Sequence, residues 1–311
     1  MSSQIKHYTT RSNRIKNSFQ DHIFDIINIA LVSIVFIVII YPLIFVISAS
    51  FSDPVEVMRG RVWLLPRGFT IEGYKRVLVY ADLWRSYANT IFYAFSGAFV
   101  VLFFTLPAAY GFSKDGFPFK KTLIFIFMFT MFFGGGLVPY YMLINNLGLI
   151  NSYITLPLLG AVSFTYIIIA RTFFKTSIPQ EILDAAAIDG CSNFASFFRI
   201  VLPLSKPIIA VIALWAAVTQ WNGYFTALLF LTERYYQPLQ IILREILIIS
   251  TVDFSQIVLG GEQAVATMER HQIAQLVKYT VMIVSSVPII MFYPFIQRYF
   301  VKGIMIGSLK G

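Results

Sequence analysis

The stretch DAAAIDGCSNFASFFRIVLP, Asp184 to Pro203, interrupts a chain that is otherwise largely apolar. It carries two aspartates, one glycine, one arginine and three phenylalanines, a mixture that suits a surface in contact with water. The sequence on both sides contains long runs without any charged residue. The contrast between this stretch and its surroundings decides the class of fold.

The composition indicates an integral membrane protein. Of its 311 residues, 58% are hydrophobic and only 13% are charged, whereas a typical soluble domain has about 25% charged residues. The mean hydropathy is +0.74. A transmembrane helix needs about 20 consecutive apolar residues, because each charge in the hydrocarbon is costly. Runs of this length predict an all-α membrane protein.

Charge-free runs predict six transmembrane helices. The run 122–170 is too long for one helix, and the turn-forming residues INNLGLINS at 144–152 divide it into two. The predicted helices are 26–52, 86–113, 122–144, 152–170, 207–232 and 279–297. They are joined and flanked by an arm at 1–25, external segments at 53–85 and 233–278, a cytoplasmic segment at 171–206 and a tail at 298–311.

The distribution of basic residues predicts that both termini lie in the cytoplasm, because Lys and Arg are more numerous on that side of the six spans. The net charge of +9 is explained by a basic rim beside anionic lipid headgroups, so nucleic acid is not an expected partner. The first run is long and lacks a small-residue cleavage pattern, so we expect it to remain as an anchor. The single cysteine, Cys191, excludes an intramolecular disulfide, and we expect its cytoplasmic thiol to stay reduced.

The sequence shows no catalytic or metal-binding pattern. The three histidines do not pair at metal-ligand spacing. Asp184 and Asp189 are five positions apart, about 140° around a helix, so they do not converge as an acid and base pair. The glycines at 134–136 are not followed by Lys-Ser or Lys-Thr, so they do not form a phosphate-binding loop. We expect no metal, no cofactor and no catalytic residue on this chain.

The cytoplasmic segment has the local signals of two short helices. Ser177 and Gln180 predict a capping box, and EILDAAAID supplies strong helix formers until Gly190. Ser192 is predicted to cap the second helix, and Pro203 to end it. In that helix an apolar face is formed by Phe194, Phe197, Phe198 and Val201. Periodicity leaves two readings open: the face packs against the protein's own helix ends, or it docks into a partner.

The spacing in this segment resembles the EAA loop of ATP-binding-cassette (ABC) importer permeases. That pattern is E-A-A, three residues, G, nine residues, I, one residue, L-P. Asp184-Ala185-Ala186, Gly190, Ile200 and Leu202-Pro203 fit every interval. Asp184 stands where Glu is usual, which keeps the charge and shortens the side chain.

The resemblance implies the type I importer permease fold, with a coupling helix that contacts a cytoplasmic ATPase. It implies that Asp184, Ala185, Ala186 and Gly190 form the ATPase contact. The residues from Phe194 to Pro203, which include Phe197, Phe198, Ile200 and Leu202, would anchor the helix to the spans.

Further stretches are similar to the carbohydrate type of these permeases. They are SYANTIFYAF from Ser86, GGGLVPYYMLINNLGLINS at 134–152, QWNGYFTALLFL from Gln220 and QRYFVKGIMIGSLKG at 297–311. The third-span stretch at 134–152 resembles Gram-positive permeases for complex oligosaccharides, and the resemblance covers a permease core of about 70–311. It implies a bacterial plasma-membrane complex of two permease subunits, two ATPases that hold ATP and Mg, and an extracellular solute-binding protein. Such a complex works by alternating access.

Residues in the spans that could contact a sugar are aromatic rings and amides: Asn89, Tyr93, Tyr140, Trp221 and Asn222. The aromatic ones equally suit the membrane interface, and the amides equally suit bonds between helices. The basic residues of the first external segment suit an acidic sugar, lipid headgroups or the binding protein. They are Arg59, Arg61, Arg67, Lys75 and Arg76.

Two other functions remain open from the sequence. One is an ABC permease for a solute other than a sugar, which the C-terminal stretch disfavours. The other is a self-sufficient carrier or channel. The lack of charged residues inside the predicted spans disfavours proton coupling, whereas sodium sites built from carbonyls and hydroxyls remain possible.

Overall fold

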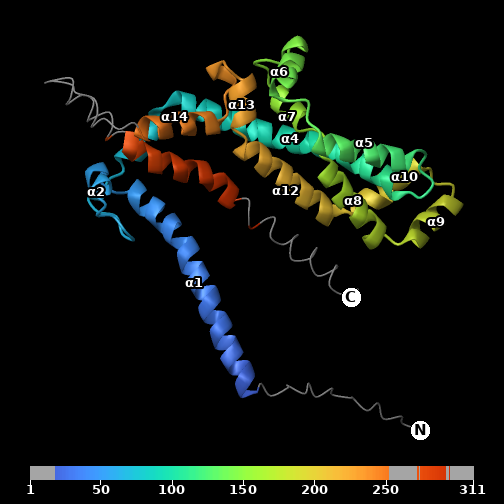
Figure 1. The fold of residues 1–311 in the computed structure, drawn as a ribbon, viewed down its shortest axis with the longest axis horizontal. Helices are drawn as coiled ribbons and strands as arrows, with labels where there is room; N and C mark the ends of the chain where they lie inside the picture. Colours follow the sequence, from blue (N-terminus) through green and yellow to red (C-terminus); the bar gives the residue numbers. More distant parts are fainter. Residues whose placement is uncertain (1–17, 252–271, 273, 292–293, 295–311) are drawn as a thin grey trace, which may run out of the picture.

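The computed structural model describes residues 18–251, 272, 274–291 and 294, and in this part of the chain every regular element is a helix (Figure 1). The all-α prediction is confirmed for these residues. The first 17 residues, part of the second external segment and the C-terminal tail lie outside the described residues. The predictions made for them are not tested.

Among the described residues, three helices are long and apolar enough to cross a membrane. They are α1 (Phe19–Ser50), α4 (Ala81–Ser113) and a helix over Ala274–Met291. They correspond to the first, second and sixth predicted spans. α1 begins earlier than predicted, where the backbone N–H of Ser18 donates to Asp21 Oδ2 at 2.7 Å and caps the first turn. Most of α1 extends away from the other helices (Figure 1).

The other predicted spans are not continuous helices. The third is divided into α5 (Lys120–Phe132) and α6 (Leu137–Asn146), which meet at 110°. The break lies at the glycines 134–136, where Gly136 has a φ of +85°, a conformation that glycine adopts without strain. The fourth is divided into α7 (Thr155–Leu159) and α8 (Phe164–Ser177). The fifth is divided into α12 (Lys206–Asn222) and α13 (Phe225–Phe230).

The remaining elements are short helices at the two ends of the long ones. They are α2 (Pro54–Met58), α3 (Glu72–Val79), α9 (Gln180–Ile188), α10 (Asn193–Ser196), the π-helix η1 (Phe197–Val201), α11 (Leu202–Leu204), the 3₁₀ helix η2 (Arg234–Tyr236) and α14 (Leu239–Thr251). The run 193–204 bends by 81° into α12. In the part of the chain that the structure describes, three helices are long and apolar enough for a span, or up to five if each bent pair is one span, so the count of six stays a prediction.

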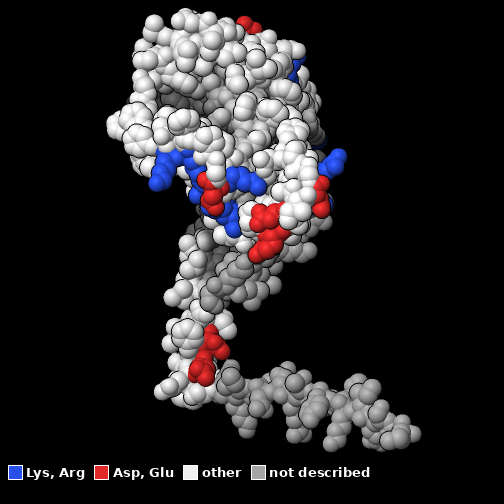
Figure 2. All heavy atoms as spheres, turned by 90° about the vertical axis from the view of Figure 1, so that its right-hand side faces the viewer, with Lys and Arg blue, Asp and Glu red and all other residues white. Residues whose placement is uncertain are grey.

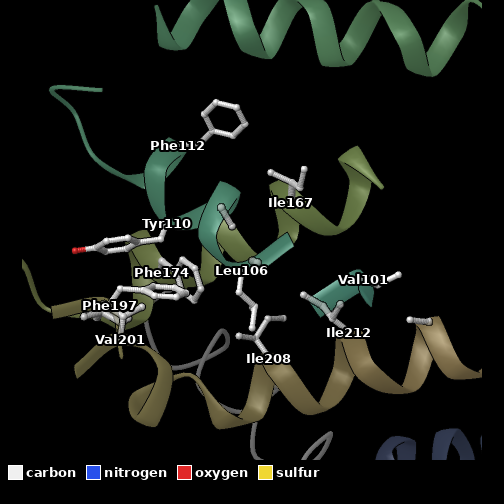
Figure 3. Packing of buried hydrophobic residues seen from close by; sticks show 14 of the residues in the cluster. Val101, Leu106, Tyr110, Phe112, Ile167, Phe174, Phe197, Val201, Ile208 and Ile212 are labelled. Atoms are coloured by element: carbon white, nitrogen blue, oxygen red, sulfur yellow. The ribbon is translucent and has the colours of Figure 1, made fainter. Parts of the chain in front are cut away.

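The core is built around α4. Its buried face packs against α12, α8, α7 and α14. Figure 3 shows part of the main cluster, in which Leu106 and Tyr110 of α4 lie near Phe174 of α8 and Ile208 of α12. Further along α4, the amide of Gln220 fills a gap beside Gly97, where a Cβ atom would lie 2.7 Å from Gln220 Cγ. Gln220 Nε2 also donates to the carbonyl of Leu156 at 3.0 Å, so one side chain joins α12, α4 and α7.

The two ends of α4 carry different structures. Figure 1 places α14 near one end of α4, and α9 and α10 near the other. Seen from the α9 end, most of the charged side chains in view form one band of both signs, a separate acidic group lies below it, and the surface above the band is almost uncharged (Figure 2).

Candidate coupling segment and pathway residues

α9 is an exposed helix at one end of the described fold (Figure 1). None of its residues is buried, and Ile188 at its end is 86% exposed. Leu183 is half-buried and faces the core cluster, so the helix contacts the rest of the protein along one narrow side. Asp184 and Ala185 are exposed, and Gln180 Nε2 donates to Asp184 Oδ1 at 2.9 Å. The carboxylate of Asp184 is therefore held along the helix surface.

The predicted capping box at the start of α9 is wrong. Ser177 is the last residue of α8, and Pro179 occupies the N-cap position with no side-chain cap. A proline disfavours the helical conformation for the residue that precedes it. Ile178 precedes Pro179 and is extended, with φ −105° and ψ 113°. Ile178 is also buried. Ser177 therefore belongs to the end of α8 and does not cap α9.

The predicted stop at Gly190 is confirmed. Gly190 has a φ of +76°, and the amide of Cys191 donates to the carbonyl of Ala186 at 2.8 Å. The amide of Gly190 donates to the carbonyl of Ala187 at 3.1 Å. These bonds close a left-handed helix end of the Schellman type, which favours glycine because it has no Cβ. The predicted cap of the next helix is also confirmed, since Ser192 Oγ accepts from the amide of Ala195 at 3.2 Å.

The phenylalanine face is divided between the interior and the surface. Phe197 is 5% exposed and Val201 is fully buried, whereas Phe198 is 50% exposed and Phe194 is more exposed still. The rings of Phe194 and Phe198 are 4.7 Å apart, so they form one exposed pair. Each of the two interpretations of the phenylalanine face therefore holds for one half of it. Phe197 and Val201 pack inward, and Phe194 and Phe198 are exposed on the surface.

Phe197 anchors the segment to the core. Its ring centroid lies 5.2 Å from that of Tyr110 on α4 (Figure 3). Phe197 begins the π-helix η1, and turns of this type are unusual and often lie at functional sites. Ile200 and Leu202 are half-buried and Pro203 is exposed. The segment is thus attached firmly at 197–201, and α9 projects beyond it.

Polar contacts that the sequence did not predict attach the other side of the segment. Arg171 Nε donates to the carbonyl of Phe112 at 2.9 Å, near the end of α4. Lys175 Nζ lies 2.8 Å from Asp115 Oδ1, and Lys120 Nζ lies 3.6 Å from the same atom. The hydrogen bond from Lys175 and the charges of both lysines lower the pKa of Asp115. α8 is therefore tied to the loop between α4 and α5 on the side where α9 begins.

At the opposite end of α4, two predicted pathway residues are buried supports. Asn89 Nδ2 donates to the carbonyls of Tyr235 and Gln237, at 2.8 and 3.1 Å. The hydroxyl of Tyr93 donates to the carbonyl of Tyr236 at 2.8 Å. Both side chains are buried. In this conformation they hold the backbone of 235–237 instead of facing an open space.

The other three predicted pathway residues lie apart from this pair. Trp221 is buried, and its ring is edge-on to Tyr87 at 6.0 Å. Asn222 is exposed, but its amide donates to the carbonyl of Val218 in its own helix. Tyr140 on α6 is partly exposed and its ring is edge-on to Phe230 at 5.7 Å. The structure does not bring the five residues together at one site.

The residues that the sequence reasoning missed are in contact with Asn89 and Tyr93. Tyr153 donates its hydroxyl to Asn89 Oδ1 at 3.3 Å, and its ring is edge-on to Tyr236 at 5.0 Å. Arg85 lies over the ring of Tyr235, with its Cζ atom 5.2 Å from the centroid. The sequence feature that could have indicated these contacts is the pair of adjacent tyrosines at 235 and 236, in an uncharged segment too short to span a membrane.

Comparisons with known proteins agree on one kind of relative. The chain is 35% identical over 292 residues to the polygalacturonan/rhamnogalacturonan transport system permease protein YtcP of Bacillus subtilis (strain 168), a match that covers 94% of this chain and 100% of YtcP. It is 35% identical over 300 residues to protein LplC of the same organism, covering 95% of this chain and 97% of LplC. No protein-family model matches the chain.

A solved structure is similar over most of the chain. It is the crystal structure of a bacterial ABC transporter involved in the import of the acidic polysaccharide alginate. One of its chains matches with a TM-score of 0.80 and 33% sequence identity, and the match covers 91% of this chain and 99% of that one.

Proposed function

The chain belongs to the carbohydrate permeases of ABC importers, and from this premise we propose that it forms half of a pathway for an oligosaccharide, completed by a second permease subunit. Its apolar helices make it a multi-pass membrane protein. We place α9 and both termini in the cytoplasm and the Arg85 end of α4 outside. The larger number of Lys and Arg residues on the α9 side of the predicted spans supports this orientation.

The proposal rests on one observation: the helix α9 is exposed, whereas the segments before and after it are attached to the rest of the fold. No residue of α9 is buried. The elements on both sides of it are attached to α4 through Phe197 and Arg171, and to the loop after α4 through Lys175. A helix held in this way transmits a push from outside to the long helices instead of bending away from it. The two permease halves would then alternate between inward-facing and outward-facing states.

The driving reaction belongs to other subunits in this proposal. Two cytoplasmic ATPases would hold ATP and Mg and would contact Asp184, Ala185, Ala186 and Gly190, together with the exposed ring of Phe198. An extracellular solute-binding protein would deliver the sugar. The names of the relatives support an oligosaccharide as substrate, and the polygalacturonan and alginate in two of them favour an acidic one.

We expect uptake to require the ATPase subunits. The test is to extract the chain in mild detergent with its partners, to reconstitute it in vesicles, and to measure oligosaccharide uptake with and without ATP on the cytoplasmic side. The complete complex should take up the sugar only with ATP, and vesicles that contain the permease subunits alone should take up none. ATP-independent uptake by this chain alone would identify it as a self-sufficient carrier and contradict the proposal.

A further inference from the structure

Arg85 and Tyr235 lie together on the surface at the end of α4 that is opposite to α9. The guanidinium carbon of Arg85 is 5.2 Å from the centroid of the Tyr235 ring, which is a cation–π distance. Arg85 is exposed, and Tyr235 is 52% exposed. The guanidinium thus lies over one face of the Tyr235 ring, and both groups are exposed at this end of α4.

The position of Tyr235 is set by buried bonds beneath it. The carbonyl of Tyr235 itself accepts from Asn89, the next carbonyl accepts from Tyr93, and the one after it accepts again from Asn89. A further hydrogen bond to α4 follows at the start of α14, where the amide of Leu239 donates to the buried Thr90 Oγ1 at 2.8 Å. A surface ring with such support is held ready for a ligand, and so loses little freedom on binding.

The charge of Arg85 is not neutralised by a carboxylate in the described part of the chain. The nearby Asp82 is bound by Arg234, at 2.7 Å from Nε to Oδ2, and Arg234 also binds Glu245 at 3.1 Å. In the first external segment, Arg59 and Arg61 share Glu56, and Arg76 binds Glu72. Arg85 therefore differs from these four arginines, because no carboxylate of the described residues is paired with its guanidinium.

A uronate ring matches this pair of side chains. A guanidinium binds a carboxylate through two parallel hydrogen bonds, a geometry that lysine does not reproduce. A tyrosine ring offers an apolar face against which the C–H face of a pyranose packs, and its hydroxyl serves the sugar hydroxyls. Neutral oligosaccharides would use only the second of these interactions.

We propose that Arg85 and Tyr235 form a subsite for a uronate unit of the transported oligosaccharide, with Arg85 on the carboxylate and Tyr235 against the ring. This inference rests on the proposed function and adds to it the residues that select an acidic sugar. It also reassigns Asn89 and Tyr93, which hold the subsite in place from below and do not contact the sugar in this conformation.

The test is uptake by the complete complex, reconstituted with its binding protein, with trigalacturonate and its uncharged counterpart galactotriose as probes. Arg85→Gln should reduce trigalacturonate uptake at subsaturating concentration by about tenfold, the loss expected for one charge-assisted bidentate pair. Arg85→Lys should recover only part of it. Tyr235→Ala should reduce it as well, and Tyr235→Phe should keep most of it.

A matched control separates this effect from general loss of positive charge. Arg244 is an exposed arginine on α14, and Arg244→Gln removes the same charge without changing the pair. Arg244→Gln should keep the melting temperature, the basal ATP hydrolysis and the trigalacturonate uptake of the wild type. Trigalacturonate uptake by Arg85→Gln and Tyr235→Ala within twofold of the wild type would overturn the subsite.

The wild-type results distinguish the two proposals. ATP-dependent uptake of galactotriose without uptake of trigalacturonate would overturn the acidic subsite and leave the permease function intact. Uptake of neither sugar, nor of other oligosaccharides, by a complex that hydrolyses ATP would contradict the proposed function itself.

Discussion

Replacing Gly190 with valine is expected to weaken coupling strongly while the protein still folds. Gly190 has a φ of +76°, a left-handed conformation that costs a side chain with a Cβ about 1–2 kcal/mol, and a β-branched one more. A Cβ at this position would meet no atom within 4 Å, so the change crowds nothing inside the chain. Its effect falls on the end of α9 and on the surface offered to the ATPase.

We expect Gly190→Val to lower both sugar uptake and transport-linked ATP hydrolysis by about tenfold or more, since about 1.4 kcal/mol in a docking equilibrium corresponds to tenfold. The melting temperature in detergent should stay close to that of the wild type. Gly190→Asn should keep much of the activity, because asparagine tolerates this conformation. Gly116→Val is the matched control, since Gly116 lies in an equally open place without a positive φ. Normal coupling in Gly190→Val would show that α9 is not the coupling helix.

The adjacent residues Phe197 and Phe198 are expected to give opposite phenotypes when each is changed to alanine. Phe197 is buried against Tyr110 and the core cluster. Removal of a buried phenylalanine costs about 3–5 kcal/mol, so Phe197→Ala should lower the melting temperature strongly and reduce the yield of folded protein. Phe198 is half-exposed, and its truncation should change the melting temperature little.

The variants of Phe197 and Phe198 also distinguish attachment of the segment to the core from docking onto the ATPase. Phe198→Ala should fold normally and co-purify with less of the ATPase subunit, because the exposed ring pair of Phe194 and Phe198 loses one member. The measurements are thermal unfolding in detergent and the ratio of ATPase to permease after purification. Equal melting temperatures for the two variants would contradict the division of the stripe. A normal ATPase ratio in Phe198→Ala would restrict docking to α9.

Local rules predicted the coupling segment well where neighbouring residues decide the conformation. Gly190 ends α9 and Ser192 caps α10 as expected, because both depend on backbone geometry within a few residues. The start of α9 was mispredicted for the same local reason. Proline at 179 extends the residue before it, and Ser177 is left in the helix behind. Two local rules compete there, and the proline rule prevails.

Periodicity predicted which residues share a face but not what covers that face. The four apolar residues of the stripe are neighbours, yet only Phe197 and Val201 meet the core. Which half turns inward depends on where α4 and α8 lie, and this is a tertiary fact. The breaks inside the third and fifth spans were missed for a related reason. Glycines at 134–136 and at 223 are compatible with a straight membrane helix as well as with a bend.

The amides in the spans were predicted either to contact a sugar or to bond to another helix, but their partners were not predictable. Asn89 bonds to carbonyls 146 and 148 positions further along the chain. Nothing in the local sequence distinguishes such a bond from a contact with a sugar, because both satisfy the same amide. The resemblance to importer permeases supplied the function, and the structure supplied the roles of these side chains.

Cross-linking from α9 to the ATPase tests the central claim most directly. In a Cys191→Ser background, a cysteine at Ile188, which is 86% exposed at the end of α9, is compared with one at Phe119, which is 81% exposed in the loop before α5. A short thiol cross-linker is applied to the assembled complex with and without ATP. We expect an adduct between the ATPase subunit and Ile188→Cys whose yield changes with ATP, and little adduct from Phe119→Cys. A complex that takes up sugar with ATP but gives no adduct from α9 would contradict the account.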